Sequence, residues 1–258
     1  MGDLQVRPIR TLIAMTGSLS MIFLDATVVG VALPTIQADL GMTTAESAWV
    51  VNAFLVAFAS TLAIGGRLGD RFGRLAVFRT AMILFAIGSL TCALASSGIA
   101  LIIARAAQGI AAGTMQPAST AIVVGSTPAG RRGRAMATYF GVALLFLMAG
   151  PVVGGLIIEL ADWPWIFLLN LPVAGMALIM SINLGLHPSS AVRRRLDLVG
   201  IATLLTGLPA LVLGLEWLGH PPTNAPWLPW LLGSLGVILT ATCIIHSARH
   251  VSPLLEVK

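Results

Sequence analysis

Two charged residues lie inside long apolar segments, where charges are rare. Asp25 lies about two-thirds of the way along the apolar segment 9–33, and Arg105 lies about one-third of the way into the segment 99–124. If these segments are helices running in opposite directions, a rise of about 1.5 Å per residue puts both charges about 10 to 12 Å below the external surface of a membrane. A charge at that depth is costly without water or a partner. We therefore expect Asp25 and Arg105 to pair, directly or through water.

Two roles remain open for this pair. In the first, protonation of Asp25 releases Arg105 and couples proton flow to a movement of the helices, because charges inside a membrane commonly mark such relays. In the second, the two residues form a fixed structural ion pair. The sequence does not decide between them.

Polar and small side chains follow Arg105 along the same segment at helical spacing. They are Gln108, Ala112, Gln116 and Ser119, three or four residues apart. A stripe of this kind predicts the wall of a watery cavity, with tight helix packing as the alternative. We interpret Gln108, Ala112 and Gln116 as cavity-lining residues.

The composition is that of an integral membrane protein. Hydrophobic residues make up 57% of the 258 residues and charged residues 10%, against about one-quarter charged residues in a soluble domain. Each apolar segment is long enough to cross a bilayer as a helix, and an isolated strand could not satisfy its backbone in lipid. We therefore predict an all-α membrane protein with eight transmembrane helices. The expected spans are 9–33, 47–66, 76–95, 99–124, 135–159, 165–186, 198–218 and 227–246.

The charges between the spans predict an orientation. Apart from Arg105, the basic residues fall in the two tails and in the connections after even-numbered spans, whereas the other connections carry acidic residues. By the positive-inside rule, both termini are expected in the cytoplasm. The net charge of +5 is therefore explained by membrane topology and does not indicate nucleic-acid binding.

Residue types that would support other chemistry do not gather in this sequence. Cys92 and Cys243 both lie inside apolar segments, and no His and Cys residues are spaced as metal ligands. No nucleophile with a nearby base and no phosphate-binding loop is evident. We expect no metal, no cofactor and no enzymatic activity.

A cluster of Gly, Arg and Asp at 65–74 separates the second and third spans. Such a composition predicts a short connection at the aqueous face, with Asp70 capping a helix start and the arginines holding the turn on the cytoplasmic side. The residues that we expect to matter there are Gly66, Asp70, Arg71, Gly73 and Arg74.

The fifth span combines a proline with several glycines. They are Gly141, Gly150, Pro151, Gly154 and Gly155. A proline removes a backbone donor and kinks a helix, and glycines four residues apart form a flat packing face. The combination predicts a helix that bends and slides against a neighbour.

These motifs together resemble the major facilitator superfamily. The cluster at 65–74 is similar to its loop motif, apart from Leu75, and the fourth and fifth spans resemble its proton-coupling and antiporter motifs. Residues 24–34 resemble the first span of the fourteen-span drug:proton antiporters, with Gly30 as a departure. The entry to the sixth span is also similar, with Pro164 as a departure, through Trp163, Trp165, Phe167, Asn170 and Pro172.

The resemblance implies a fold and a function. Residues 1–187 would form the N-terminal six-helix bundle, and residues 188–258 a basic cytoplasmic loop, two extra spans and a short tail, with the C-terminal bundle absent. The implied activity is proton-coupled export of a lipophilic, preferably cationic compound across the plasma membrane, with Asp25 and Arg105 coupling the protons. One bundle supplies one wall of a transport site, so a second half or a second copy would be needed. The alternative is a truncated, non-transporting fragment or a membrane scaffold protein.

Overall fold

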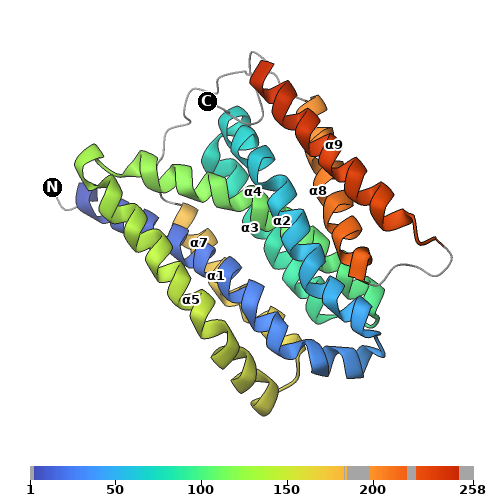
Figure 1. Ribbon diagram of the computed structural model, residues 1–258. Coiled ribbons are helices and arrows are strands. Elements are labelled where there is room, and N and C mark those ends of the chain that lie inside the picture. The colour runs from blue at the N-terminus through green and yellow to red at the C-terminus, as the bar shows by residue number, and fades with distance from the viewer. Residues whose placement is uncertain (1–2, 183, 185–197, 220–224, 250–258) are drawn as a thin grey trace.

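The structure, a computed structural model, describes residues 3–182, 184, 198–219 and 225–249 (Figure 1). Eight helical segments of this part of the chain are long and apolar enough to cross a membrane. The prediction of an all-α membrane protein with eight spans is confirmed. The basic loop expected at the start of 188–258 lies mostly outside the described residues.

The elements follow the chain in this order: α1 (Asp3–Leu40), α2 (Thr44–Phe72), α3 (Arg74–Ala93), α4 (Gly98–Ser126), the 3-10 turn η1 (Ala129–Arg131), α5 (Arg132–Leu160), α6 (Pro164–Leu168), α7 (Asn170–Ile182), α8 (Leu198–Gly219) and α9 (Leu228–Arg249). Together, α6 and α7 make the sixth span, interrupted at Leu169. Pro172 has no N–H to donate to the carbonyl of Leu168, which accounts for a break at this point.

The connection between α2 and α3 is shorter than predicted. The helix α2 continues to Phe72, and Gly73 alone joins it to α3 with a φ of 93°, which favours glycine. The expected loop at 65–74 is therefore wrong in its extent. Gly65 lies so close to the backbone of Thr114 that a Cβ would have no room, so packing on α4 supports the helix through the glycine-rich stretch.

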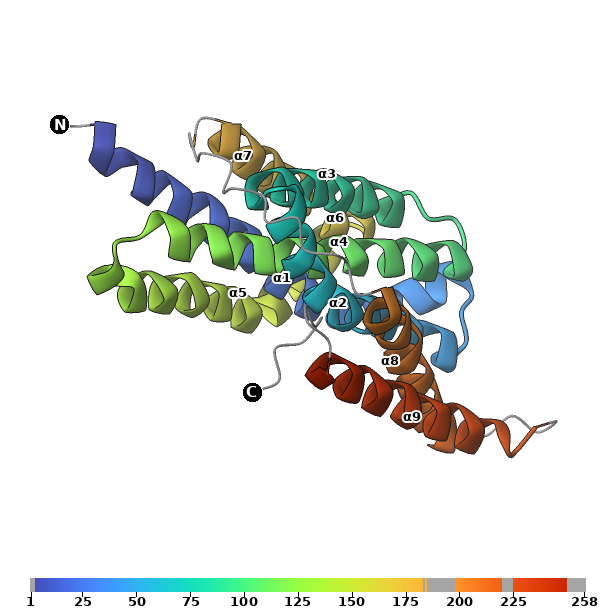
Figure 2. The same ribbon diagram turned by 90° about the horizontal axis from the view of Figure 1, so that it is seen from above.

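The helices pack in pairs. In Figure 1, α1 lies along α5, and α2 lies along α4, which also contacts α3. The helix α7 contacts α1 and α3. Figures 1 and 2 show α8 and α9 side by side at one edge of the structure, where α8 contacts α2.

The buried and exposed apolar residues agree with a lipid environment. Two clusters of buried side chains fill the space among α1 to α7, one around Phe85 and Met115 and the other around Leu101 and Phe167. Large apolar side chains also cover the outside, and Leu160 is 81% exposed. Water would disfavour such a surface, whereas acyl chains would cover it.

Candidate functional site

Asp25 and Arg105 meet at the centre of the bundle. The carboxylate of Asp25 on α1 accepts a hydrogen bond through Oδ2 from Nη1 of Arg105 on α4, at 2.5 Å. Both side chains are completely buried. The contact expected from their matched depth is therefore present, and it is direct.

The other carboxylate oxygen is held by two amides. Oδ1 of Asp25 accepts a hydrogen bond from Nδ2 of Asn170 on α7 at 2.8 Å and another from Nε2 of Gln108 on α4 at 3.3 Å. Both amide side chains are buried. Both carboxylate oxygens of Asp25 thus accept hydrogen bonds from buried side chains.

A serine of α3 closes the network. The hydroxyl oxygen of Ser89 accepts hydrogen bonds from Nε2 of Gln108 at 2.7 Å and from Nδ2 of Asn170 at 3.2 Å. The two amides therefore bridge Ser89 to Asp25. Side chains from α1, α3, α4 and α7 converge on this point.

Arg105 has further partners on α2, α4 and α6. Its Nε donates to the carbonyl oxygen of Val50 at 3.0 Å, and its Nη1 also donates to Oε1 of Gln108 at 2.6 Å. The guanidinium carbon lies 4.2 Å from the ring centre of Phe54 and 5.7 Å from that of Phe167, which adds cation–π attraction. Nη2 has no hydrogen-bond partner among the described residues. The N–H groups of Nη2 therefore have no acceptor in the described part of the chain.

The other residues of the polar and small-residue stripe on α4 differ in how deeply they are buried. Ala112 is buried in the apolar core, and Gln116 is partly buried. The glycines beside the stripe pack on α2: a Cβ at Gly109 would meet the carbonyl of Phe54, and one at Gly113 would meet Thr61 and Phe58. Close helix packing, the alternative interpretation of this stripe, is therefore observed at the glycines.

The glycines of α5 divide into two groups. A Cβ at Gly150 would meet Thr27 of α1, and one at Gly154 would meet Val28, whereas Gly141 and Gly155 face open space. The hydroxyl of Thr27 also donates to the carbonyl of Leu147 at 3.0 Å. Pro151 lies within the helix beside this contact and is exposed.

The charged residues between α2 and α3 form a separate group. The expectation that Asp70 caps α3 is wrong. Asp70 lies in the last turn of α2 and pairs with Arg74 at 3.3 Å, while Gly73 occupies the capping position of α3. The guanidinium of Arg71 lies over the ring of Phe72 at 5.3 Å. Gly66 lies within α2, facing Pro117 of α4.

Two members of the buried network were not predicted. Asn170 entered the sequence analysis only through its resemblance to a motif, and Ser89 did not enter it at all. A lone serine in an apolar helix gives no signal, because the helix phase that turns it toward Asp25 depends on packing. Asn170 was detectable as one of the few amides in an apolar segment.

Comparison with known proteins gives a consistent family. The model of the Major Facilitator Superfamily matches residues 15–248. An uncharacterized MFS-type transporter of Mycobacterium tuberculosis is 36% identical over 222 residues, which are 84% of this chain and 37% of that protein. The multidrug export protein EmrB of Escherichia coli is 33% identical over 239 residues, which are 91% of this chain and 45% of that protein.

A third relative is the tetracenomycin C resistance and export protein of Streptomyces glaucescens, 34% identical over 83% of this chain and 40% of that protein. The chain thus spans less than half the length of these curated relatives. Among solved structures, a peptide transporter, POT, matches with a TM-score of 0.68 and 19% identity, over 95% of this chain and 52% of that one. At this identity the match shows a shared fold.

Proposed function

Because the chain belongs to the major facilitator superfamily, which its sequence motifs had predicted, we propose that it takes part in proton-driven export of lipophilic compounds. The relatives named above include a multidrug export protein and a tetracenomycin C export protein, which supports this direction of transport and this class of substrate. The proposed location is the plasma membrane, with both termini in the cytoplasm, in agreement with the distribution of basic residues.

The observation that carries the proposal is the direct bond between Asp25 and Arg105 inside a network that joins several helices. A proton from outside would bind the carboxylate and remove its negative charge. The attraction to Nη1 of Arg105 would fall, while Arg105 would keep its bonds to Val50 on α2 and Gln108 on α4. Protonation would therefore loosen α1 from α2 and α4, while the guanidinium would keep its hydrogen bonds to these two helices.

Such loosening suits alternating access. In this family, transport is a rocking of two bundles around a site at their interface near the middle of the membrane. We propose that the helices α1 to α7 supply one wall of this site and that a second half, or a second copy of the chain, supplies the other. Release of the proton to the cytoplasm would restore the ion pair and reset the bundle.

The test is efflux driven by an imposed pH gradient in everted membrane vesicles that contain the full chain with any partners from its own membrane. Asp25→Asn removes the proton site and keeps the shape of the side chain, although its amide nitrogen cannot accept a hydrogen bond as the carboxylate oxygen in its place does. We expect gradient-driven efflux to be lost while the variant still inserts at the normal level. The matched control is Asp39→Asn on the same helix, because Asp39 is exposed and accepts a hydrogen bond from Trp163 that an amide oxygen can also accept.

Two results would overturn the proposal. If Asp25→Asn retained full coupling, Asp25 would not be the proton carrier. The vesicles contain the unaltered chain and the other proteins of its membrane. If they moved no lipophilic dye under any imposed pH gradient, the export activity itself would be excluded.

A further inference from the structure

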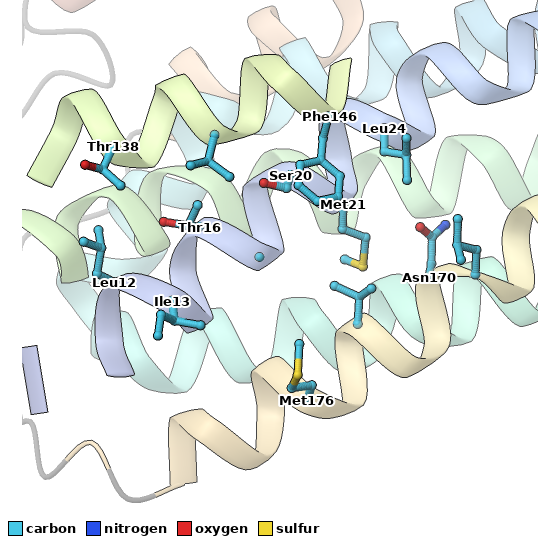
Figure 3. A pocket seen from close by; sticks show the side chains of 14 residues that line it. Leu12, Ile13, Thr16, Ser20, Met21, Leu24, Thr138, Phe146, Asn170 and Met176 are labelled. Atoms are coloured by element: carbon cyan, nitrogen blue, oxygen red, sulfur yellow. The ribbon is translucent and has the colours of Figure 1, made fainter. Parts of the chain in front are cut away.

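A cavity of about 390 Å³ lies between α1, α5 and α7 (Figure 3). Figure 3 shows Met21 of α1, Phe146 of α5 and Met176 of α7 around it, and the other apolar walls include Leu12, Ile13 and Val173. This volume is within the range of small-molecule sites, about 300 to 1,000 Å³, which are also mostly apolar. The cavity is thus large enough for a drug-sized molecule.

Two hydroxyl groups in the cavity wall have no partner. Oγ1 of Thr16 and Oγ of Ser20 are buried without a hydrogen bond among the described residues, and the two residues are 7% and 3% exposed. By contrast, the hydroxyl of Ser18 on the same helix donates to the carbonyl of Met15 at 2.7 Å. A buried hydroxyl without a partner carries a desolvation penalty that a bound oxygen or nitrogen atom would remove.

The spacing of these hydroxyls sets the geometry of an occupant. Residues four apart lie on one face of a helix, about one turn or 5 to 6 Å from each other. A molecule with two oxygen atoms at about that separation would satisfy both Thr16 and Ser20. Its carbon skeleton would meet Met21 and Met176, whose flexible side chains adapt to different shapes.

The charge of the wall sets the class of occupant. The residues that line the cavity are all uncharged, so a cation entering it would lose its hydration without meeting a carboxylate. Asn170 closes the inner end, and its amide nitrogen already donates to Asp25 and Ser89. Asp25 is therefore shielded from the cavity by Asn170, and the site suits a neutral molecule.

We propose that this cavity binds neutral, lipophilic molecules with hydrogen-bonding oxygen atoms and that Thr16 and Ser20 select them. The inference deepens the proposed function and rests on it, since it narrows the exported lipophilic compounds to neutral ones. It departs from the cationic class that the resemblance implied. In this proposal, the side chain of Asn170 separates the bound molecule from the proton site at Asp25. Binding needs no gradient, so it can be measured separately from transport.

The experiment titrates Nile Red, a neutral dye with a carbonyl oxygen, into the full chain in lipid nanodiscs at constant pH, with empty nanodiscs as the blank. We expect saturable fluorescence above the blank, not displaced by the oxygen-free cation tetraphenylphosphonium. The double variant T16V/S20A keeps the shapes of the side chains and should weaken binding about tenfold, since it removes two hydrogen bonds. The variant Thr16→Ser keeps the hydroxyl and should bind normally.

A second pair of variants tests the place of binding. A side chain at Gly17 would enter the cavity without a clash at Cβ, so Gly17→Leu should abolish saturable binding. Gly30 on the same helix also faces open space but lies outside the cavity, so Gly30→Leu should bind as the unaltered chain does. Equal binding by Gly17→Leu, or by T16V/S20A, would overturn the proposal, as would displacement by the cation. Absence of saturable binding by the unaltered chain, with coupling through Asp25 intact, would overturn this inference alone and leave the proposed function in place.

Discussion

Asp25 and Arg105 are both fully buried, and each is the ionic partner of the other. Buried ion pairs are seldom retained for stability, because the cost of desolvating two ions can equal their attraction. Replacing one partner alone is different, since an uncompensated charge then stays behind. Comparing the stability of a chain that lacks one partner with that of a chain that lacks both therefore separates the contribution of the charges from that of the side-chain shapes.

A double-mutant cycle on this pair is expected to show strong coupling. Arg105→Leu leaves Asp25 without its ionic partner and should lower stability by about 3 to 5 kcal/mol. Asp25→Asn combined with Arg105→Leu should recover much of this loss, because no charge remains. The measurement is thermal unfolding in detergent, read from tryptophan fluorescence. A double variant as unstable as Arg105→Leu alone would show that lost packing on Phe54, rather than the charge, dominates.

At the scale of single residues, the sequence predicted the contact between the two charged side chains but not the hydrogen bonds of the uncharged polar side chains around them. The depth of Asp25 and Arg105 followed from helix rise and from the direction of the spans, and neither depends on the details of packing. The hydrogen bonds of Asn170 and Ser89 depend on how α7 and α3 are rotated about their axes. Apolar helices in lipid have little amphipathic pattern to set that rotation, so their contacts appear only in the structure.

Glycines decide how closely two helix pairs approach. Gly109 and Gly113 let α4 lie on the backbone of α2, and Gly150 and Gly154 do the same for α5 on α1. Without a hydrophobic effect between helices in lipid, this close contact supplies much of the attraction. Each pair is thus sensitive to added volume at specific positions.

We expect Gly113→Val to destabilise the bundle, because its Cβ would overlap Thr61 and the backbone of Phe58. Overpacking of this kind costs about 1 to 3 kcal/mol and more where the backbone has to move. Gly141→Val on α5 is the matched control, since Gly141 is exposed and its Cβ would meet nothing. The check is the melting temperature of both variants in the same detergent. Equal melting temperatures would contradict the assigned α2–α4 contact.

The existence of the elements was predictable, but their ends were not. Eight apolar segments near the length of a bilayer gave the eight spans correctly. Glycine and charged residues dominate the stretch from Gly65 to Phe72 and predict a connection, whereas this stretch is helical in the structure. Local composition does not report that α4 lies close enough to support it.

The whole molecule consists of the bundle α1 to α7 and the pair α8 and α9 beside it (Figure 2). A polar contact joins the two parts: Nδ2 of Asn52 on α2 donates to Oε2 of Glu216 on α8 at 3.4 Å. Apolar residues of α2 and α8, among them Leu55 and Leu208, line the space next to it. The pair is therefore held against α2.

The proposed orientation predicts which connections reach each side of the membrane. In a chain without Cys92 and Cys243, both of which are buried, Gly130→Cys between α4 and α5 should be protected from an impermeant thiol reagent in intact cells and labelled in everted vesicles. Ser96→Cys between α3 and α4 should show the opposite pattern. Both positions are exposed. Labelling of both from one side would contradict the assigned topology.

A transport site with a single wall needs a partner, so we expect the chain to belong to a larger assembly. Extraction from its own membrane into nanodiscs, followed by native mass spectrometry, should give the mass of two chains or of one chain with a second transporter half. A single chain that nevertheless catalyses gradient-driven efflux would contradict this requirement. A single chain without efflux would favour the scaffold alternative.

Gly73 is the only residue between α2 and α3, so these two helices meet at a bend without an intervening loop. Val50 and Ser89 both lie far from Gly73 along their helices, and both touch the groups that hold Asp25. Because no loop separates α2 from α3, a small tilt of either helix that begins near Asp25 and Arg105 cannot be absorbed in a loop. We expect such a tilt to be transmitted to the arginine-rich end of the two helices.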